Sequence, residues 1–422
     1  KSPPVRKMVS AEVVGREHAT CIKVAAKDSL YVTRNYIVTH NTGTMLSVLD
    51  AHYMAGEDAP TLILAPLRVA RRTWARESQK WHEFSHLDVV PIVGTVKERL
   101  AALRRDAPIY TTNYENIVWL TEHWGDRWPY KIIVADESTK LKSVRLSFQT
   151  SRKGKEFVNG QGGKRARALG KVAHTHAEKF YELTGTPSPN GLADLWGQMW
   201  FLDRGRRLGR TFGAFQERWF KPKPNGWGVE PLPHAETQIH EAIRDLCLAI
   251  DGKDWFDLRE PVVNIVPVEL PPSARKIYRD MEKEMFAQIG DRTAESFNAA
   301  AKTQKLLQCA NGAMYVDPLV ESDDNPRSKE WREVHDEKIA ALDSLLTEIG
   351  PEPVIVVYEF RSDLARLMKA FPEGRPLRSE ADEDAFRAGE VPILFMHPQS
   401  GGHGIDEFQY VCNQMIFFGN NW

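Results

Sequence analysis

The sequence predicts an α/β protein built on parallel sheets. Short, continuous apolar runs, such as TLILA at 61–65 and PVIVVY at 353–358, are typical of strands that are covered on both faces. Amphipathic stretches that suit helices lie between these runs, and strands that alternate with helices indicate parallel pairing. The pattern occurs twice along the chain, at 42–201 and at 261–422, so we expect two α/β units.

The order of elements in the first unit follows from its apolar periodicity. We expect a helix at the start of this unit, then strands and helices in alternation, with two buried strands near its end. The expected elements are helix Leu46–Met54, strand Thr61–Ala65, helix Val69–Trp81, strand Val89–Ile92, helix Val96–Arg105, strand Ile109–Thr111, helix Tyr114–Leu120, strand Lys131–Ala135 and strand Phe180–Leu183.

The second unit is expected to open with a strand and two strong helices, and to continue as an α/β unit. The expected elements are strand Val262–Leu270, helices Ala274–Ala287, Ser296–Leu307 and Asp336–Ile349, strand Pro353–Tyr358, helix Leu364–Ala370, and strands Val391–Met396 and Met415–Phe418.

Two further segments differ from these units in composition. Residues 1–41 hold only short alternating or β-branched runs, which predict an all-β segment. Residues 202–260 are rich in Trp, Pro, Gly and Arg, which favours an insertion followed by a linker. The β runs of the first segment are Glu12–Val14, Thr20–Val24, Leu30–Thr33 and Tyr36–Thr39.

Composition excludes several classes of protein. The 422 residues are 42% hydrophobic and 27% charged, as in globular proteins, and a net charge of −1 means that any nucleic-acid surface is local. The four cysteines lie far apart without a CxxC pair, so neither a zinc site nor a disulfide framework is expected. No apolar run reaches about 18 residues, so we expect no membrane span and a cytoplasmic location.

An acidic pair, Asp136 and Glu137, directly follows the strand 131–135. In nucleotide-hydrolysing α/β proteins, a carboxylate at the end of a strand binds Mg²⁺ and the next Glu polarises the attacking water. An acidic helix start is the alternative for such a pair taken alone.

A second motif, LTGTPSPN at 183–190, ends another strand. Thr184 and Thr186 are candidates for sensing the γ-phosphate and passing its state to the second unit. The alternative is a tight turn built by Gly and Pro.

Two further loops follow strands. Arg68 follows Ala-Pro in LAPLRV and lies at the start of a basic helix. The backbone amides and the arginine at such a helix start can bind phosphates. An ordinary amphipathic helix with the same pattern is the alternative. The loop PQSGGHGID at 398–406 has adjacent glycines that allow close approach to a nucleotide or a nucleic acid, and a flexible loop is the alternative.

Basic residues gather at 145–167 and at 204–210. Either cluster could neutralise phosphates, and a solvated loop is the alternative for each. The candidates for DNA contacts are Arg165 and Arg167 of the first cluster and Lys142 just before it, in addition to Arg68.

Taken together, the motifs resemble those of superfamily-two helicase-like ATPases, most closely the Swi/Snf-type branch found in phages. The resemblance covers Thr42–Trp422 and rests on APLRVARRTW, DESTKLKS, LTGTPSPNGLADLWGQMWFLD, KLLQCANGAMY, VIVVYEFRSDL and SGGHGID. It implies two RecA-like lobes that bind ATP and Mg²⁺ between them and DNA across them. The activity implied is that of an ATP-dependent DNA translocase or helicase in a bacterial or phage-infected cell, and we expect a monomer.

The resemblance also assigns roles to residues of the site. Asp136 and Glu137 match the Walker B pair, with Asp136 on Mg²⁺. The second lobe's Gly-rich motif, which touches both DNA and ATP, corresponds to Gly402 and Asp406. The remaining nucleotide contacts fall on Thr42, Gly43, Thr44, Thr184 and Thr186.

The junction YIVTHN-Thr42 carries a different chemistry. An Asn side-chain amide can attack its own carbonyl and cleave the chain, a preceding His can assist, and a following hydroxyl can hold an ester. The stretch 19–41 resembles the C-terminal end of an intein, which assigns cyclisation to Asn41, assistance to His40 and the first extein position to Thr42. A degenerate phosphate loop with an accidental His-Asn is the alternative.

Cys21 extends this resemblance. Its position in ATCIKV matches the initiating nucleophile of one intein subclass, and Thr39 before the His fits that subclass. The alternative is a small buried core residue.

Two departures from the helicase pattern matter. The phosphate loop G-x-x-x-x-G-K-[ST] should precede the helix at Leu46, yet Thr42-Gly43-Thr44 has no Lys before it. Inteins are frequently found inside such loops, so Thr42 is expected to be the Mg²⁺-binding Thr of a loop whose Gly-Lys half lies in a missing N-terminal partner. The arginine motif of the second lobe is also absent.

The chain alone is therefore not expected to hydrolyse ATP, whereas the spliced protein is. The rival hypothesis is a catalytically inactive, helicase-like module that only binds DNA. The intact pair Asp136 and Glu137 argues against it.

Overall fold

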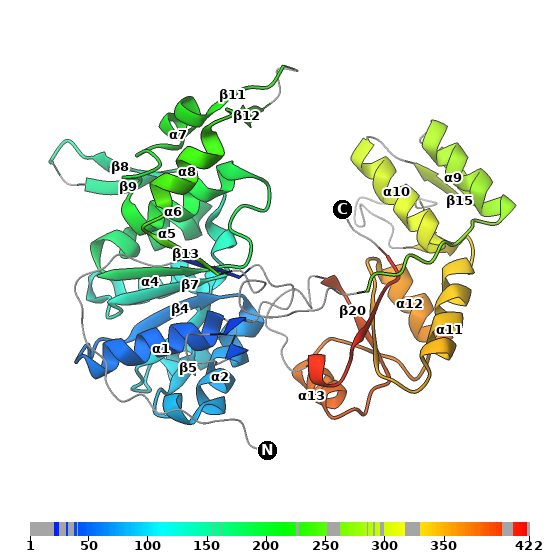
Figure 1. Ribbon diagram of the computed structural model, residues 1–422, viewed down its shortest axis with the longest axis horizontal. Helices are drawn as coiled ribbons and strands as arrows, with labels where there is room; N and C mark the ends of the chain where they lie inside the picture. The colour runs from blue at the N-terminus through cyan, green and yellow to red at the C-terminus, as the bar shows by residue number, and fades with distance from the viewer. Residues whose placement is uncertain are drawn as a thin grey trace. The chain divides into compact units, whose positions relative to one another are not determined.

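The computed structural model describes residues 21–24, 31–32, 38–39, 41–154, 156–161, 163–224, 228–250, 262–284, 286–289, 292–295, 299–316, 330–398 and 408–419. The chain divides into two compact units, Lys1–Glu260 and Pro261–Trp422 (Figure 1). Each unit contains one parallel sheet, which confirms the predicted α/β class.

The sheet of the first unit has seven strands in the order β13-β1-β10-β7-β4-β6-β5. Every pairing in it is parallel, and the five strands predicted for this unit are all present, with bounds that differ by at most two residues. The strands are β1 Cys21–Val24, β4 Thr61–Ala65, β5 Val89–Pro91, β6 Ile109–Asn113, β7 Ile132–Asp136, β10 Lys179–Leu183 and β13 Cys247–Ile250.

Helices cover both faces of this sheet, which explains why a central strand such as β4 is apolar on both faces. Along β4, Leu62 and Leu64 belong to one core and Ile63 and Ala65 to the other, because successive side chains point to opposite faces. One face carries helices α1 Asn41–Met54 and α2 Trp74–Lys80 and the π-helix η1 Val69–Thr73, and the other carries α4 Ile117–Trp124, α5 Gly163–Thr175 and α6 Leu195–Asp203.

All four helices predicted for this unit differ from their expected bounds. The stretch expected as one helix at Val69–Trp81 is the π-helix η1 followed by α2, and the helix expected at Val96–Arg105 ends three residues early. α1 begins at Asn41, five residues before the expected start, so Thr42-Gly43-Thr44 forms its first turn. The stretch expected as one helix at Tyr114–Leu120 is a 3-10 turn, η3 Tyr114–Asn116, followed by α4. The helix expected near 96 is α3 Val96–Ala102, and a full capping box between Thr95 and Glu98 fixes its start.

The segment 202–260 packs largely into the first unit. Phe215, Trp219 and Ile239 are fully buried in the same core as Trp200 of α6, and β13 is the edge strand of the sheet. The elements of this segment are α7 Phe212–Trp219, β11 Phe220–Pro222, β12 Val229–Pro231, α8 Ala235–Ile243 and β13.

The N-terminal segment does not stand apart from this unit. The strand expected at Thr20–Val24 forms as β1, but it pairs in parallel with β10 and β13 inside the large sheet. A strand between two parallel neighbours satisfies its backbone groups on both sides, which a short separate segment does less well. The other two expected strands form the antiparallel pair β2 Tyr31–Val32 and β3 Val38–Thr39, and 12–14 lies outside the described residues.

The second unit has a four-stranded parallel sheet in the order β19-β20-β18-β21. Val356 and Phe395 of the sheet pack against Leu367 of the covering helices. The strands are β18 Val354–Val357, β19 Arg375–Pro376, β20 Ile393–Met396 and β21 Gln414–Phe417, and the helices are α9 Pro272–Glu284, α10 Ala299–Asn311, α11 Glu337–Ile349, α12 Arg361–Ala370 and α13 Glu380–Arg387. Two antiparallel pairs complete it, β14 Phe286–Ile289 with β15 Arg292–Glu295 and β16 Ala313–Tyr315 with β17 Trp331–Glu333.

One predicted strand of this unit is wrong. Residues 262–270 have no regular secondary structure and pair with no strand of the described part of the chain, and Val262 and Ile265 are 87% and 88% exposed. Their apolar composition suits a strand, but Pro267 interrupts the run and cannot donate to a ladder.

Among the described residues, no helix has the length and apolar character that crossing a membrane requires.

Candidate functional site

The ends of three neighbouring strands, β4, β7 and β10, form the candidate site. In the register of the sheet, Asp136 at the end of β7 lies opposite Leu183 at the end of β10, and Ala135 lies opposite Leu64 of β4. The carboxyl ends of parallel strands share one edge, where ligands of α/β sheets bind. The sheet therefore brings the acidic pair and the LTGT motif to the same edge, as the sequence motifs require.

Asp136 is held by two aromatic residues. Its side chain is only 4% exposed, and its Oδ2 accepts a hydrogen bond from Nε1 of Trp74 at 3.0 Å. Its carbonyl oxygen accepts a second bond from the Tyr114 hydroxyl at 2.8 Å. Burial, and then the charge of Asp136, raises the pKa of Tyr114 well above its usual range, so this hydroxyl remains a donor. The carboxylate is thus fixed before any ligand arrives.

Glu137 has a left-handed backbone, with φ 55° and ψ 53°. It is one of two residues other than glycine with a positive φ in the described part of the chain, and this conformation costs about 1–2 kcal/mol for an L-residue. The turn ends β7 and begins the 3-10 helix η5 Ser138–Leu141. Such strain gathers at functional sites, because the surrounding structure must hold it in place.

A buried amide joins the two motifs. The Ser138 hydroxyl donates to Oε1 of Gln198 at 2.9 Å, and Nε2 of Gln198 donates to the carbonyl oxygens of Pro187 at 2.5 Å and Asp194 at 3.0 Å. Ser138 is fully buried and Gln198 is 1% exposed. Gln198 of α6 therefore ties the residue after Glu137 to the residue after Thr186.

The threonine motif has a bond of its own. Thr184 is fully buried, and its hydroxyl accepts a hydrogen bond from the backbone N–H of Thr186 at 3.1 Å. This local bond shapes the turn that follows β10.

A buried acid lies beneath these motifs. Glu182 of β10 is fully buried, and neither of its carboxyl oxygens has a hydrogen-bond partner among the described residues. Burial, and then the nearby Cys247, raises the pKa of Glu182 well above its usual range, and the neighbouring Ser138 hydroxyl only partly opposes this. Burial without a hydrogen-bond partner among the described residues therefore favours the neutral form of this side chain.

The first turn of α1 supplies hydroxyl groups. Thr42 is 5% exposed, the Ser47 hydroxyl donates to the Gly43 carbonyl at 3.1 Å, and the Thr44 hydroxyl is buried with no partner in the described part of the chain. The N–H groups at a helix start are natural phosphate donors. The sequence has no lysine between Lys27 and Lys80.

Several predicted site residues cannot be placed. His40, Gly402 and Asp406 lie outside the described residues, and of Asn41 and Cys21 only the backbone is described. Asn41 is the first residue of α1, and Cys21 opens β1 opposite Glu182 and Cys247.

The predicted DNA-binding residues are spread over the first unit. Arg68 and Lys142 are half-buried, just before η1 and just after η5. Arg165 pairs with Glu115 at 2.6 Å, but both side chains are more than half exposed, so the pair contributes little. Arg167 is exposed.

Sequence reasoning missed Trp74, Tyr114, Glu182 and Gln198. Trp74 and Tyr114 read as ordinary core aromatics in an apolar pattern. Two signals were available in the sequence: a glutamate between Tyr and Leu in FYEL, and a glutamine in a helix without a polar face. A polar residue in an apolar stretch is unusual and indicates a specific role.

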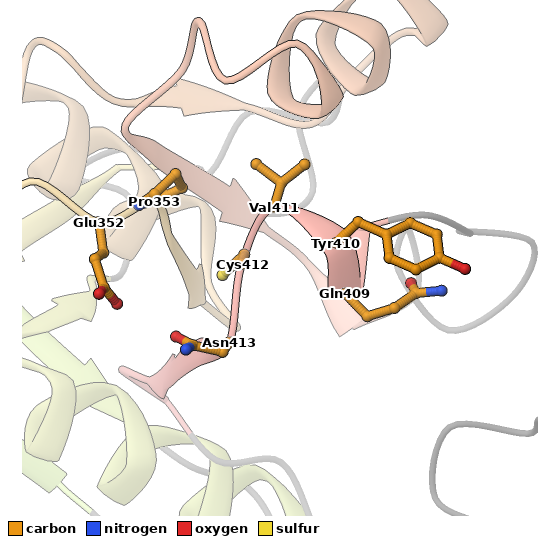
Figure 2. Close-up of a pocket in the computed structure, with 7 residues that line it drawn as sticks. All are labelled: Glu352, Pro353, Gln409, Tyr410, Val411, Cys412 and Asn413. Atoms are coloured by element: carbon orange, nitrogen blue, oxygen red, sulfur yellow. The ribbon is translucent and has the colours of Figure 1, made fainter. Parts of the chain in front are cut away.

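A hollow of about 310 Å³ lies elsewhere, in the second unit (Figure 2). Glu352 and Pro353 line it just before β18, and Cys412 and Asn413 line it just before β21. Figure 2 shows Gln409 and Tyr410 on its other side. It therefore lies at the amino ends of the strands, away from the carboxyl ends where these sheets place their motifs.

Comparison with known proteins decides the family. The SNF2-related domain matches residues 41–312, which is more than half of the chain. Protein p41 of Acyrthosiphon pisum secondary endosymbiont phage 1 is 47% identical over 391 residues, a match that covers 90% of this chain and 79% of that protein. The chain belongs to the SNF2-related family. It therefore carries an ATPase and helicase domain of the SNF2 type.

More distant SNF2 relatives are much longer. The transcription regulatory protein SNF2 of Saccharomyces cerevisiae is 24% identical over 244 residues, and the human helicase-like transcription factor is 27% identical over 238. These matches cover 55% and 54% of this chain but only 13% and 21% of those proteins.

Two solved structures are similar over nearly the whole chain. The Sulfolobus solfataricus SWI2/SNF2 ATPase core in complex with dsDNA is 15% identical, covers 95% of this chain and 83% of its own, and has a TM-score of 0.42. The Pyrococcus furiosus Hef helicase domain is 12% identical, covers 95% and 86%, and has a TM-score of 0.43. The SNF2 assignment comes from the sequence matches and not from these likenesses.

Proposed function

We propose that this chain is the greater part of an ATP-dependent DNA translocase or helicase whose ATP site is centred on Asp136 and Glu137. The observation that carries the proposal is the geometry of this pair within a SNF2-related domain. Asp136 is fixed by Trp74 and Tyr114, and Glu137 is held in a strained turn beside the LTGT motif. An acidic helix start without a function would need neither the fixed carboxylate nor the strained backbone.

The donor atoms fit Mg²⁺ and a nucleotide. The Asp136 carboxylate is a hard oxygen ligand, and the unpartnered, buried Thr44 hydroxyl lies in the helix turn that also holds Thr42. No group of three His, Cys, Asp or Glu in the described residues could hold a metal without help, which agrees with Mg²⁺ bound by one carboxylate and substrate phosphates.

Each residue then has a separate task. When bound, ATP would supply the transferable phosphoryl group and Mg²⁺ would neutralise its charge. Asp136 and Thr42 would hold the metal, Glu137 would orient the attacking water, and the amides of the first α1 turn would bind phosphate. By the family resemblance, Thr184 and Thr186 would sense the state of the γ-phosphate, and Gly402 and Asp406, which lie outside the described residues, would contact ATP and DNA.

The lysine of the phosphate loop is proposed to come from a segment N-terminal to Thr42. The 422-residue chain should therefore show no DNA-stimulated ATPase activity above that of an Asp136→Ala control. A form in which a Gly-Lys loop directly precedes Thr42 should hydrolyse ATP.

Glu137→Gln tests this assignment in the form with the complete loop. We expect ATP hydrolysis to fall about 100-fold or more, because general-base assistance is lost, while ATP and DNA binding remain. Glu122→Gln, on an exposed position of α4, is the matched control and should keep normal turnover. Normal turnover in Glu137→Gln would reject this role, and no turnover in any form would favour the rival hypothesis of a module that only binds DNA.

We further propose that residues 1–41 are the C-terminal segment of an intein. The SNF2-related match begins at residue 41, and α1 begins at the same residue. The match to p41 leaves about a tenth of this chain uncovered. Residues 1–41 make up about the same share, so the two lengths agree. The pairing of β1 within the SNF2-related unit counts against the proposal.

Splicing assays separate the two views. With the N-terminal partner supplied, Asn41→Ala should block release of residues 1–41, and Thr42→Ala should stop ligation but allow cleavage, both measured by mass spectrometry. Cleavage that continues in Asn41→Ala would reject the intein. In an intein-free form, Thr42→Ala should also abolish Mg²⁺-dependent hydrolysis, whereas Thr42→Ser should keep it.

A further inference from the structure

A β-hairpin between the acidic pair and the LTGT motif has no part in the ATP site. Its strands, β8 Arg145–Thr150 and β9 Glu156–Gln161, pair over six residues each. Figure 1 shows it extending outward from the body of the first unit. Gly160, with φ 134°, closes its base, because a Cβ there would lie 2.2 Å from the Arg145 carbonyl oxygen.

The base of the hairpin is firmly anchored. Leu146 is 1% exposed, and the Phe148 ring stacks on Trp200 of α6 at 5.5 Å between centroids. Arg145 lies over the Phe212 ring at 3.6 Å and donates to two backbone carbonyls. The hairpin is thus a rigid extension of the unit, and Arg145 is part of its anchor.

The tip of the hairpin is basic. The hairpin, residues 145–161, contains four Lys or Arg and one acidic residue, Glu156, and the start of α5 directly after it adds Lys164, Arg165 and Arg167, which makes seven basic residues in a protein whose net charge is −1. Two of the seven are used internally, Arg145 on Phe212 and Arg165 on Glu115. At the tip, Arg152 and Lys153 are exposed, and neither forms an ion pair within the described residues. A positive field of this density attracts a polyanion.

An exposed aromatic residue accompanies these cations. Phe157 of β9 lies opposite Gln149, one residue from the tip end of the strand, and is 44% exposed. Cations beside an exposed aromatic ring are the combination that binds nucleic-acid strands, the cations to phosphates and the ring to bases. A merely solvated hairpin has no need of the ring.

We propose that this hairpin is a DNA-binding arm in which Arg152 and Lys153 neutralise phosphates and Phe157 stacks on an unpaired base. The arm lies outside the motifs that the family resemblance assigned to DNA. The proposal rests on DNA as the partner in the proposed function. It adds a contact that no ATP-site residue supplies.

The test is DNA binding by the 422-residue chain, measured by fluorescence anisotropy from 50 to 200 mM salt on duplex and single-stranded probes. For the duplex, Arg152→Ala with Lys153→Ala should reduce the slope of log affinity against log salt by about 2, because each phosphate contact contributes about 0.9. At the lowest salt the affinity should fall tenfold or more. Lys221→Ala with Lys223→Ala, on the β11–β12 hairpin of the same unit, is the matched control and should leave the slope unchanged.

Phe157→Ala tests the stacking contact. Affinity for the single strand should fall about fivefold or more, and affinity for the duplex should not change. Equal losses on both probes, or none, would overturn stacking. If the Arg152 and Lys153 variant binds DNA as the Lys221 and Lys223 control does, the arm is overturned, although the proposed DNA partner stands. If the wild-type chain binds no DNA, both the arm and the DNA partner of the proposed function are rejected. Circular dichroism should show every variant folded, because all changed side chains lie on the surface.

Discussion

Both units bury polar side chains, and a cluster in the first unit differs in charge from a cluster in the second. In the first unit, Ser138 and Gln198 are uncharged, and burial favours the neutral form of Glu182 beside them. In the second unit, Arg366 and Asp363 are 3% and 0% exposed, and Lys338 lies largely buried with them. Neutral groups can be buried with few bonds, whereas buried ions need nearly complete pairing.

The charged cluster has more hydrogen bonds than the neutral one, but its pairing is incomplete. Oδ1 of Asp363 and Nε of Arg366 have no partner among the described residues, and burial raises the pKa of Asp363 above its usual value. Arg366 donates to the carbonyl oxygens of Asn311 and His335, each at 2.6 Å, and to Asp336 at 2.9 Å. Lys338 donates to the Asn311 side chain at 2.8 Å and to the Phe418 carbonyl at 2.9 Å. Glu182, by contrast, has no hydrogen bond in the described part of the chain. The charged cluster therefore joins α10, α11, α12 and the residue after β21, while the neutral cluster positions the loops after β7 and β10, where we propose the ATP site.

The largest loss of stability is expected when the buried Arg366 guanidinium is removed. Arg366→Met leaves the Asn311 and His335 carbonyls without their partner and should lower the stability of the second unit by about 3–5 kcal/mol. Native-state hydrogen exchange of β18 and β20 should report the loss, and β4 and β7 of the first unit should not change. Arg332→Met, at a half-exposed ion pair with Glu330, is the control and should cost under about 1 kcal/mol. A loss that small for Arg366→Met would contradict the contrast between the clusters.

The next effect concerns pH in the first unit. His174 packs against Phe148 and Trp200, and burial lowers its pKa from 6.5 to about 4. The folded state therefore binds this proton less readily than the unfolded state does. The contribution of neutral His174 to the free energy of unfolding is fully present above pH 6.5. It is lost, by up to about 3 kcal/mol, as the pH drops from 6.5 to 4.

His174→Phe should remove this acid dependence. Chemical denaturation of both proteins at several pH values would show it. An unchanged acid slope in His174→Phe would assign the loss to another group.

A smaller effect is expected at the amide that joins the motifs. Gln198→Leu leaves the Ser138 hydroxyl and the Pro187 and Asp194 carbonyls without a partner, which should cost about 1–3 kcal/mol. In the form with the complete phosphate loop, turnover should fall more than the KM for ATP rises. Ser138→Ala is the second arm of a double-mutant cycle, and the two changes together should cost less than the sum of the two singly. If the two losses of stability are strictly additive, the Ser138–Gln198 hydrogen bond does not couple the two residues.

The fold was largely predictable because its strands carry an unambiguous signal. The runs at 61–65 and 131–135 are apolar on both faces, so their number and order identified a parallel sheet. The strand expected at 262–270 is not formed, although its apolar residues are of the same kind as those of the true strands. Pairing also depends on a neighbouring strand, which the local sequence does not specify. β1 shows the same limit, since its residues predicted a strand but not the sheet that it joins.

The site was predictable only in part, for a related reason. Asp136, Glu137, Thr184 and Thr186 follow strands, so motif and topology alone place them on one edge. The groups that hold them come from other helices. Gln198 lies sixty residues from Ser138 and Trp74 sixty-two from Asp136, and no local pattern marks either contact.

The smallest change at pH 5 is expected from Glu182→Met. An apolar side chain of similar size replaces a carboxyl group whose neutral form is favoured and which has no hydrogen bond among the described residues, so the stability of the first unit should change by less than about 1 kcal/mol. The pH dependence then has a definite sign. The folded pKa of Glu182 is raised, so the folded state keeps this proton while the unfolded state loses it above pH 4.5, and wild-type stability falls as pH rises. Glu182→Met should therefore become more stable than the wild type as pH increases from 5 to 8, in denaturation followed by hydrogen exchange of β7 and β10. A variant that is less stable at pH 8 than at pH 5, relative to wild type, would mean that Glu182 is ionised and paired in the folded protein, and the contrast between a neutral and a charged cluster would not hold.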